Sequence, residues 1–163
     1  MSAISSKAGT YSSKAGTYCL VLRATRGVRI RVGSFGTFTF VPGLYLYVGS
    51  ARGPGGLRAR IGRHLRRDKV KRWHIDYLTA SSSFRPVGVF TGMSERRMEG
   101  TLVAELMRAG IDQCVAGFGS TDDPRVTSHL LAATTSLEEC RRIVQRSFSR
   151  LFPFRSAFLA LGQ

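Results

Sequence analysis

Five side chains of this sequence have the chemistry needed to cleave a phosphodiester bond. Tyr18 ends a Gly-Thr-Tyr triplet at the start of an apolar run, and Tyr47 begins a Tyr-Val-Gly triplet at the end of another. Arg60 and His64 are four residues apart in a basic segment, so they are neighbours on one side of a helix. Glu99 falls within an apolar helical pattern, where a carboxylate must be paired, protonated or metal-bound.

Each of these side chains can be given a role from its chemistry. Hydrolysis needs an activated water, neutralisation of negative charge and a proton for the leaving oxygen. Glu99 can anchor Mg²⁺, which often takes one or two carboxylates and keeps several waters. Arg60 can brace a phosphate, and Tyr18 or His64 can accept a proton from water. Tyr47 can form a hydrogen bond with the phosphate or with a bound water. Taken singly, each residue also has a plainer reading as a packing, ion-pairing or surface residue.

The elements that must position these residues are a small antiparallel sheet and a helix. Residues 18–23 and 44–48 predict strands, and the alternation of apolar and polar side chains over 28–41 predicts a hairpin between them. A glycine-rich turn then leads into a helix whose apolar residues are four apart. Arg60 and His64 lie at the margin of that apolar stripe, which predicts that both lie between the helix and the sheet.

The second half of the chain predicts two more helices and a last strand. Ser94 is placed to cap a helix over about 94–109, and Glu99 then falls in the middle of its apolar face. Residues 128–132 predict a last strand, and Ser136 with a glutamate three residues later predicts the start of another helix. Residues 73–78 fit either a short helix or a strand.

The N-terminus contains a perfect repeat, because SSKAGTY occurs at 5–11 and again at 12–18. Seven residues are too few for a structural repeat, and only the second copy leads into a strand. Tyr18, and not Tyr11, is therefore the candidate. We expect residues 1–15 to be a mobile leader, residues 16–133 to form the main domain, and residues 134–163 to form a basic helix with an apolar tail.

The charge of the chain favours a polyanionic partner. The sequence has 25 Lys and Arg against 10 Asp and Glu, a net charge of +15, and no acidic residue precedes Asp68. Three scattered cysteines do not make a disulfide framework or a metal site. No segment predicts a signal peptide or a membrane span, so we expect a cytoplasmic protein that binds nucleic acid.

A patch of basic residues follows the predicted arginine helix and ends at a tryptophan. Phosphate contacts from such a patch give affinity and salt dependence but no choice of sequence. We expect six residues to contact nucleic acid in this way: Arg63, Arg66, Arg67, Lys69, Lys71 and Arg72.

Together these residues resemble the GIY-YIG nucleases. The two tyrosine triplets are similar to the paired signatures of that family, Arg60 and His64 to its R-x-x-x-H helix, and Glu99 to its metal-binding glutamate. The resemblance is closest to the Uri branch and covers most of the chain. Its motifs stand here in order as the Y-V-G-S-A stretch at 47–51, the glycine turn at 53–56, R-x-x-R-H at 60–64, W-H-I-D-Y-L at 73–78, F-G-S-x-D at 118–122 and S-H-L at 128–130.

This resemblance implies a fold and a function. The family core is an α/β (α+β) arrangement in which helices flank a three-stranded antiparallel sheet, here with the 28–41 hairpin inserted. The implied activity is that of an endonuclease, dependent on Mg²⁺ or Mn²⁺, that hydrolyses phosphodiester bonds in DNA. It also implies that Tyr18 and Tyr47 lie on adjacent strands and face the site. By the same resemblance Arg60 contacts the phosphate, Glu99 binds the metal, and Tyr18 or His64 assists proton transfer. We assign His74, from the branch-specific motif, to this site as well.

The sequence departs from the branch at one loop and leaves other functions open. The branch usually carries cysteines between the F-G-S-x-D and S-H-L motifs, and this chain has none there. A thiol-dependent role for that loop is therefore excluded. Two alternatives need only the positive charge: a nucleic-acid-binding protein without catalysis, and a structural protein associated with RNA.

Overall fold

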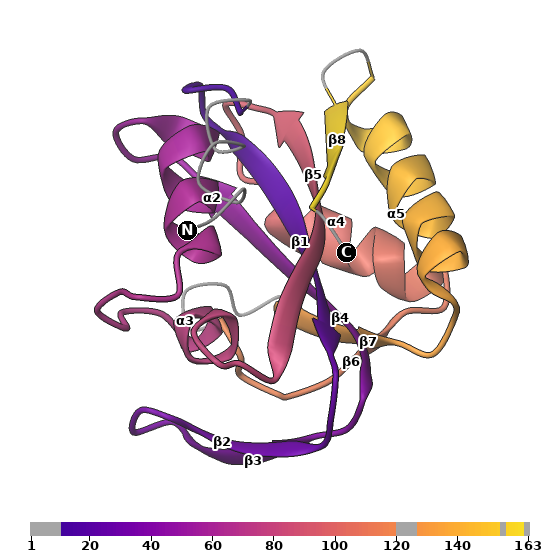
Figure 1. Cartoon of the computed structure of the whole chain (residues 1–163). Coiled ribbons are helices and arrows are strands. Elements are labelled where there is room, and N and C mark those ends of the chain that lie inside the picture. Colours follow the sequence, from indigo (N-terminus) through magenta and orange to yellow (C-terminus); the bar gives the residue numbers. More distant parts are fainter. Residues whose placement is uncertain (1–10, 120–126, 154–155, 162–163) are drawn as a thin grey trace.

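The computed structural model describes residues 11–119, 127–153 and 156–161 of the chain. Figure 1 shows one twisted sheet with helices on both of its faces. All neighbouring strands of this six-stranded sheet pair antiparallel, in the order β6-β7-β4-β1-β5-β8. The strands are β1 (Gly16–Ala24), β4 (Gly43–Ala51), β5 (Phe84–Met93), β6 (Asp112–Gln113), β7 (Leu130–Ala133) and β8 (Ser156–Ala160).

The helices divide between the two faces of the sheet (Figure 1). The helices α2 (Gly56–Leu65) and α3 (His74–Thr79) cover one face, and α4 (Glu99–Arg108) and α5 (Leu137–Leu151) cover the other. Successive side chains of a strand point to opposite faces, so Tyr18 and Leu20 join the core under α2 and α3 whereas Cys19 and Val21 join the core under α4 and α5. Among the described helices, none has the length and apolar composition that a membrane span requires.

The predicted mixed α/β class is confirmed, and so is the hairpin. The hairpin consists of β2 (Val28–Val32) and β3 (Gly36–Phe40), which pair with each other in a separate two-stranded sheet. The three-stranded core corresponds to β4-β1-β5, but the sheet continues on both sides of it. On one side β7 and β6 add to β4, and on the other β8 adds to β5.

The apolar C-terminal tail thus supplies an edge strand. Phe158 of β8 packs against Phe90 of β5 with ring centroids 4.4 Å apart. The backbone of β5 would otherwise present unpaired N–H and C=O groups along this edge, and β8 satisfies them.

One helix start differs from the sequence prediction. The helix expected from Ser94 begins only at Glu99, because the Ser94 hydroxyl accepts a hydrogen bond from the Arg96 amide and stabilises a local turn instead. Glu99 therefore lies in the first turn of α4, and it is buried on the same side of the helix as Leu102 and Val103, as the sequence predicted. The ambiguous segment 73–78 is helical, as α3. The cap at Ser136 is confirmed, because its hydroxyl accepts a hydrogen bond from the Glu139 amide.

The expected mobile leader lies outside the described residues up to residue 10, but residues 11–15 are packed against α2. Tyr11 is buried, and the carbonyls of Ser12 and Lys14 accept hydrogen bonds from the Arg58 and Leu57 amides. The first N–H groups of a helix have no partner within it. The segment before β1 therefore caps the helix that carries the candidate arginine and histidine.

Candidate active site

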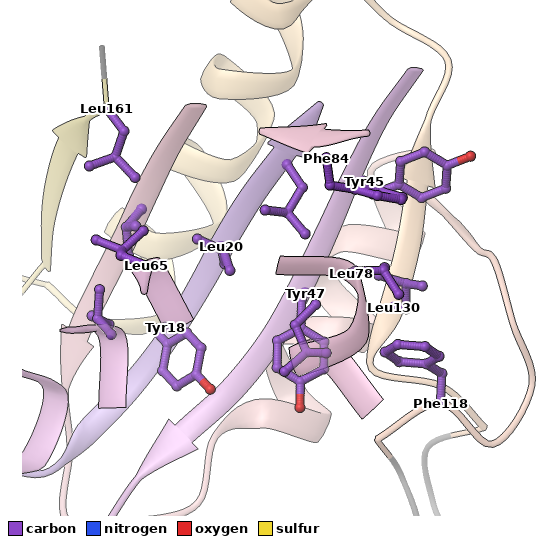
Figure 2. Close-up of a cluster of buried hydrophobic side chains, with 14 of the residues drawn as sticks. Tyr18, Leu20, Tyr45, Tyr47, Leu65, Leu78, Phe84, Phe118, Leu130 and Leu161 are labelled. Carbon is purple, nitrogen blue, oxygen red and sulfur yellow. The ribbon is translucent and has the colours of Figure 1, made fainter. Parts of the chain in front are cut away.

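The two candidate tyrosines lie side by side on the face that α2 and α3 cover. Tyr18 is on β1 opposite Gly49, and Tyr47 is on β4 opposite Leu20. Their ring centroids are 6.4 Å apart, and Figure 2 shows both hydroxyls pointing in the same direction. The register of β1 and β4 therefore brings together two phenols from distant parts of the sequence.

The glycine of the second triplet is required by this packing. A Cβ at Gly49 would lie 2.4 Å from the hydroxyl oxygen of Tyr18, closer than any real contact. Tyr18 thus lies directly over the Gly49 backbone, and a larger residue at position 49 would displace its hydroxyl.

His64 comes from the last turn of α2 and contacts both tyrosines. Its Nε2 and the Tyr18 hydroxyl form a hydrogen bond of 2.7 Å, and its ring lies 6.1 Å from that of Tyr47. The sequence placed His64 at the margin of the apolar stripe, between the helix and the sheet, and its imidazole is fully buried there, with a relative exposure of 1%. Because α3 and the segment before it fold over this end of α2, Trp73 and Asp76 complete the enclosure.

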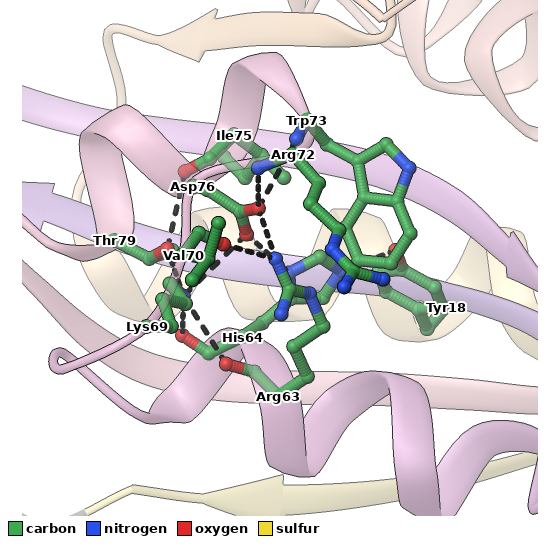
Figure 3. Close-up of polar contacts among 10 residues, drawn as sticks. All are labelled: Tyr18, Arg63, His64, Lys69, Val70, Arg72, Trp73, Ile75, Asp76 and Thr79. Atoms are coloured by element: carbon green, nitrogen blue, oxygen red, sulfur yellow. Dashed lines mark hydrogen bonds and ion pairs between the residues drawn. The ribbon is translucent and has the colours of Figure 1, made fainter.

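A buried carboxylate on α3 holds this side of the site together. Asp76 is fully buried and accepts hydrogen bonds from Arg63 Nη2 at 2.7 Å and from the Arg72 and Trp73 amides. Its other oxygen lies 3.6 Å from Lys69 Nζ. Burial alone would raise the pKa of Asp76, but the hydrogen bonds outweigh burial and hold that pKa well below its usual range. Figure 3 shows this network.

Arg60 is held by stacking and not by an ion pair. Its guanidinium lies over the Trp73 ring, 4.2 Å from the centroid, and Arg63 lies over the same ring at 4.6 Å. No salt bridge occupies Arg60 within the described residues. Its charge lowers the pKa of both Tyr18 and Tyr47. A guanidinium that is held by stacking and has no ion-pair partner is free to bind an anion such as a phosphate.

Glu99 approaches from the α4 side of the sheet. It is 7% exposed, and its Oε1 accepts a hydrogen bond of 3.1 Å from the Ser50 hydroxyl. Arg97 lies 4.0 Å from the same oxygen and is mostly exposed, whereas Oε2 is buried without a hydrogen-bond partner in the described part of the chain. The Glu99 charge raises the pKa of both Tyr18 and Tyr47, so it acts on the hydroxyls without touching them.

The phenols and the imidazole are neutral at pH 7. Burial raises the pKa of Tyr18 well above its ordinary value, and Tyr47 and the two carboxylates raise it further. Burial also raises the pKa of Tyr47 to about 12. Burial lowers the pKa of His64, although Asp76 opposes this effect. A neutral imidazole is therefore hydrogen-bonded to a neutral phenol, which is the state needed for proton transfer between them.

His74 was expected in the candidate site, but the structure places it beside that site. Its ring stacks on Phe35 of the hairpin at 4.3 Å, and its Nδ1 accepts a hydrogen bond from the Gly119 amide. In the described residues it makes no hydrogen bond or ring contact with the five candidate residues. It contacts Phe118, which packs against Tyr47, so His74 supports the wall beside the tyrosines. Hydrogen bonding from the loop and stacking from the hairpin explain this orientation.

Two of the six expected phosphate-binding residues are engaged inside the protein. Arg63 pairs with Asp76. Lys69 donates hydrogen bonds to the carbonyls of Arg63 and His64 and to the Thr79 hydroxyl, and its side chain is 1% exposed. Burial lowers the pKa of Lys69 to about 8. The other four are exposed and remain predicted phosphate contacts: Arg66, Arg67, Lys71 and Arg72.

The donor set for a metal ion is small. No group of three or more His, Cys, Asp or Glu side chains occurs among the residues that the structure describes. Glu99 Oε2 has no hydrogen-bond partner among the described residues and is the kind of oxygen that binds a divalent ion, but it is buried, so a hydrated ion could reach it only if the residues around it moved. Glu99 would then be the residue that holds Mg²⁺ or Mn²⁺.

Asp76 is the residue of the candidate site that sequence reasoning left without a role. Its position three residues after Trp73 is the spacing of a helix-capping acid, and its side chain does accept the Trp73 amide. That spacing could have predicted the cap, but the contacts with Arg63, His64 and Lys69 depend on how α2 and α3 pack.

Comparison with known proteins gives one match. No match to the chain was found among curated proteins or among solved structures. Residues 17–152 match a family described as a domain of unknown function, and this segment includes both tyrosines, α2, α3, Glu99 and α5. Because the match covers most of the sequence, the chain belongs to the DUF123 family.

Proposed function

We propose that this protein is a metal-dependent endonuclease of the GIY-YIG type that hydrolyses phosphodiester bonds in DNA. One observation carries the proposal: the buried hydrogen bond between Tyr18 and His64, beside Tyr47. Arg60 and Glu99 both act on the two hydroxyls through their charge. Structural packing alone would not require a buried phenol hydrogen-bonded to an imidazole beside a second phenol.

Tyr18 and His64 together can activate a water. The water oxygen forms a bond to phosphorus while the bond from phosphorus to the leaving oxygen breaks. One proton of the water passes to the Tyr18 oxygen as the Tyr18 proton passes to His64 Nε2. The leaving oxygen takes a proton from a second water, and the imidazolium returns its proton to the hydroxide that remains. Because Tyr18 transfers its proton as it accepts another, no buried phenolate has to persist.

The other groups bind and stabilise the phosphate. Arg60, which lies over the Trp73 ring, binds the phosphate oxygens in this proposal and offsets the extra negative charge of the transition state. Tyr47 donates a hydrogen bond to the phosphate. A divalent ion held by Glu99 would supply further positive charge to the same oxygens. The exposed Arg66, which directly follows the helix of Arg60, extends the contact along the DNA strand.

A nicking assay tests this proposal. Supercoiled and branched DNA are incubated with Mg²⁺ or Mn²⁺ and with wild type, Glu99→Gln, Arg60→Gln or Tyr18→Phe. We expect each variant to lose roughly 10²- to 10⁴-fold in cleavage rate, the usual effect of removing an acid–base or charge-stabilising group. The matched controls are Glu105→Gln, another buried glutamate of α4, and Arg58→Gln, an exposed arginine of α2. Cleavage that persists in the first three variants contradicts the assignment.

A second function is favoured by the burial of Glu99. A carboxylate that is 7% exposed leaves little room for an ion, and a nucleic-acid-binding protein without catalysis needs only the exposed cations. Such a protein would bind DNA or structured RNA with strong salt dependence. It would show no cleavage with any divalent metal, and Glu99→Gln would not weaken its binding.

A further inference from the structure

Two buried polar atoms behind the catalytic pair face each other without a hydrogen bond. The Nδ1 atom of His64 and the Oδ1 atom of Asp76 are 3.7 Å apart. Both are buried, and neither has a hydrogen-bond partner among the described residues. A buried polar group without a partner is costly, so a small approach that closes this gap would satisfy both atoms.

The carboxylate is fixed so that only one of its oxygens can face the imidazole. Its Oδ2 accepts hydrogen bonds from Arg63 Nη2 at 2.7 Å, from the Arg72 amide at 2.9 Å and from the Trp73 amide at 3.1 Å. Rotation about the carboxylate axis would break all three. Oδ1 therefore stays directed toward His64 and Lys69, as Figure 3 shows.

We propose that Asp76 is a positioning residue that holds His64 in the tautomer with its proton on Nδ1. A carboxylate can only accept, so Nδ1 must carry the hydrogen if the two atoms are to bond. Nε2 then carries no proton and can accept the proton of the Tyr18 hydroxyl. The catalytic consequence rests on the proposed nuclease function, whereas the tautomer itself does not.

Asp76 acts on His64 mainly by accepting a hydrogen bond and less through its negative charge, because nearby cations offset that charge. Burial and the cations Lys69 and Arg60 lower the pKa of His64, and Asp76 opposes them. Asp76 is itself paired with Arg63 and near Lys69, which reduces its net field at the ring. The titratable or charged groups that face His64 come from five elements or segments: Tyr18 of β1, Tyr47 of β4, Arg60 of α2, Lys69 of the following loop and Asp76 of α3.

A purely structural role for Asp76 makes a different prediction. Asp76 joins Arg63, Lys69 and the start of α3, and these contacts alone could explain its burial. In that case the tautomer of His64 would not depend on the carboxylate. The two roles are separated by observing the imidazole directly and not by stability or activity alone.

The substitution Asp76→Asn reverses the hydrogen bonding at His64. Three N–H groups converge where Oδ2 lies, so the amide oxygen of the asparagine must take that place. Its NH2 group then faces His64 Nδ1 and can only donate. We expect the imidazole to move its proton to Nε2, as occurs when the aspartate of a catalytic triad is replaced by asparagine.

The experiment is a ¹⁵N-edited NMR measurement of the histidine side chains at pH 7 without DNA. The chain has three histidines, and His64→Gln assigns the signal of His64. In wild type and in Tyr18→Phe we expect the Nδ1–H tautomer, because Asp76 and not Tyr18 sets it. In Asp76→Asn we expect the Nε2–H tautomer, together with a 10²- to 10⁴-fold lower kcat and little change in KM for DNA.

The proposal fails if wild type has the Nε2–H tautomer, a result that needs no variant to fold. It also fails if folded Asp76→Asn keeps the Nδ1–H tautomer. A wild-type protein with the Nδ1–H tautomer but no cleavage would contradict the nuclease function and leave the positioning role intact. Retention of full activity by Asp76→Asn in a protein that does cleave would remove the catalytic consequence.

Discussion

Glu99 and Glu105 offer the sharpest test of the candidate site, because they are buried glutamates on one helix with different partners. Glu105 pairs with Arg108 and with Arg150, the latter at 2.6 Å. Glu99 receives one hydrogen bond from a hydroxyl, and its second oxygen is buried without a hydrogen-bond partner in the described part of the chain. A glutamate kept for stability should resemble Glu105, whereas one kept for binding an ion should cost stability while the ion is absent.

The expected effects of the two substitutions have opposite signs. In Glu99→Gln the protein no longer buries a half-satisfied charge, which is worth about 1–3 kcal/mol. The helix N-terminus and exposed Arg97 favour the charge by up to about 1 kcal/mol each. We therefore expect Glu99→Gln to be neutral or more stable by about 1 kcal/mol. Glu105→Gln loses two partners and should be less stable by roughly 1–3 kcal/mol.

Thermal unfolding with and without Mg²⁺ measures both effects. At ten times its Kd, an ion that binds only the folded state stabilises it by about 1.4 kcal/mol, or roughly 3–5 °C in a protein of this size. We expect this shift in wild type and Glu105→Gln and its loss in Glu99→Gln. A Glu99→Gln protein less stable than Glu105→Gln, or with an unchanged Mg²⁺ shift, would refute the reasoning.

Two further predictions concern the basic patch and the tyrosine pair. Arg66→Gln should reduce the slope of log K for DNA against log salt by about 0.9, because one phosphate contact is lost, whereas the buried Lys69→Met should lower the melting temperature and leave the slope unchanged. Equal slopes in both variants would contradict the assignment of the exposed patch. Gly49→Ala should displace the Tyr18 hydroxyl and destabilise the protein by about 1–3 kcal/mol, whereas Gly53→Ala, which meets no atom within 4 Å, should not. Thermal unfolding compares Gly49→Ala with Gly53→Ala. Similar stabilities would show that Tyr18 can move away from the Gly49 backbone without cost.

The sequence predicted the elements whose signal is local. The alternation over the hairpin, the apolar spacing of α2 and the cap at Ser136 each depend on neighbouring residues, and each is confirmed. The start of α4 was wrong because Ser94 can satisfy a nearby amide without a helix. The edge strand β8 was not predicted, since its partner β5 is distant in the sequence.

In the candidate site, too, the features with a local sequence signal were predicted and those that depend on tertiary packing were not. Tyr18, Tyr47 and His64 could be chosen from the sequence, and the structure brings them into contact. Whether a basic side chain faces solvent or a buried carboxylate could not be read from the sequence, because that depends on the packing of α3 against α2. Lys69 and Arg63 were therefore assigned to phosphate, although both are paired with Asp76.

The balance of charge around the tyrosines separates the roles of the two carboxylates. Asp76 and Glu99 both raise the pKa of Tyr18. Asp76 is flanked by two cations and accepts three hydrogen bonds, so it needs no further positive charge. Glu99 has one exposed arginine at 4.0 Å and an oxygen without a hydrogen-bond partner among the described residues. A cation added near these tyrosines would therefore gain most at Glu99, whereas the proton transfer that we propose lies on the side of Asp76. The charges of both carboxylates reach the Tyr18 hydroxyl.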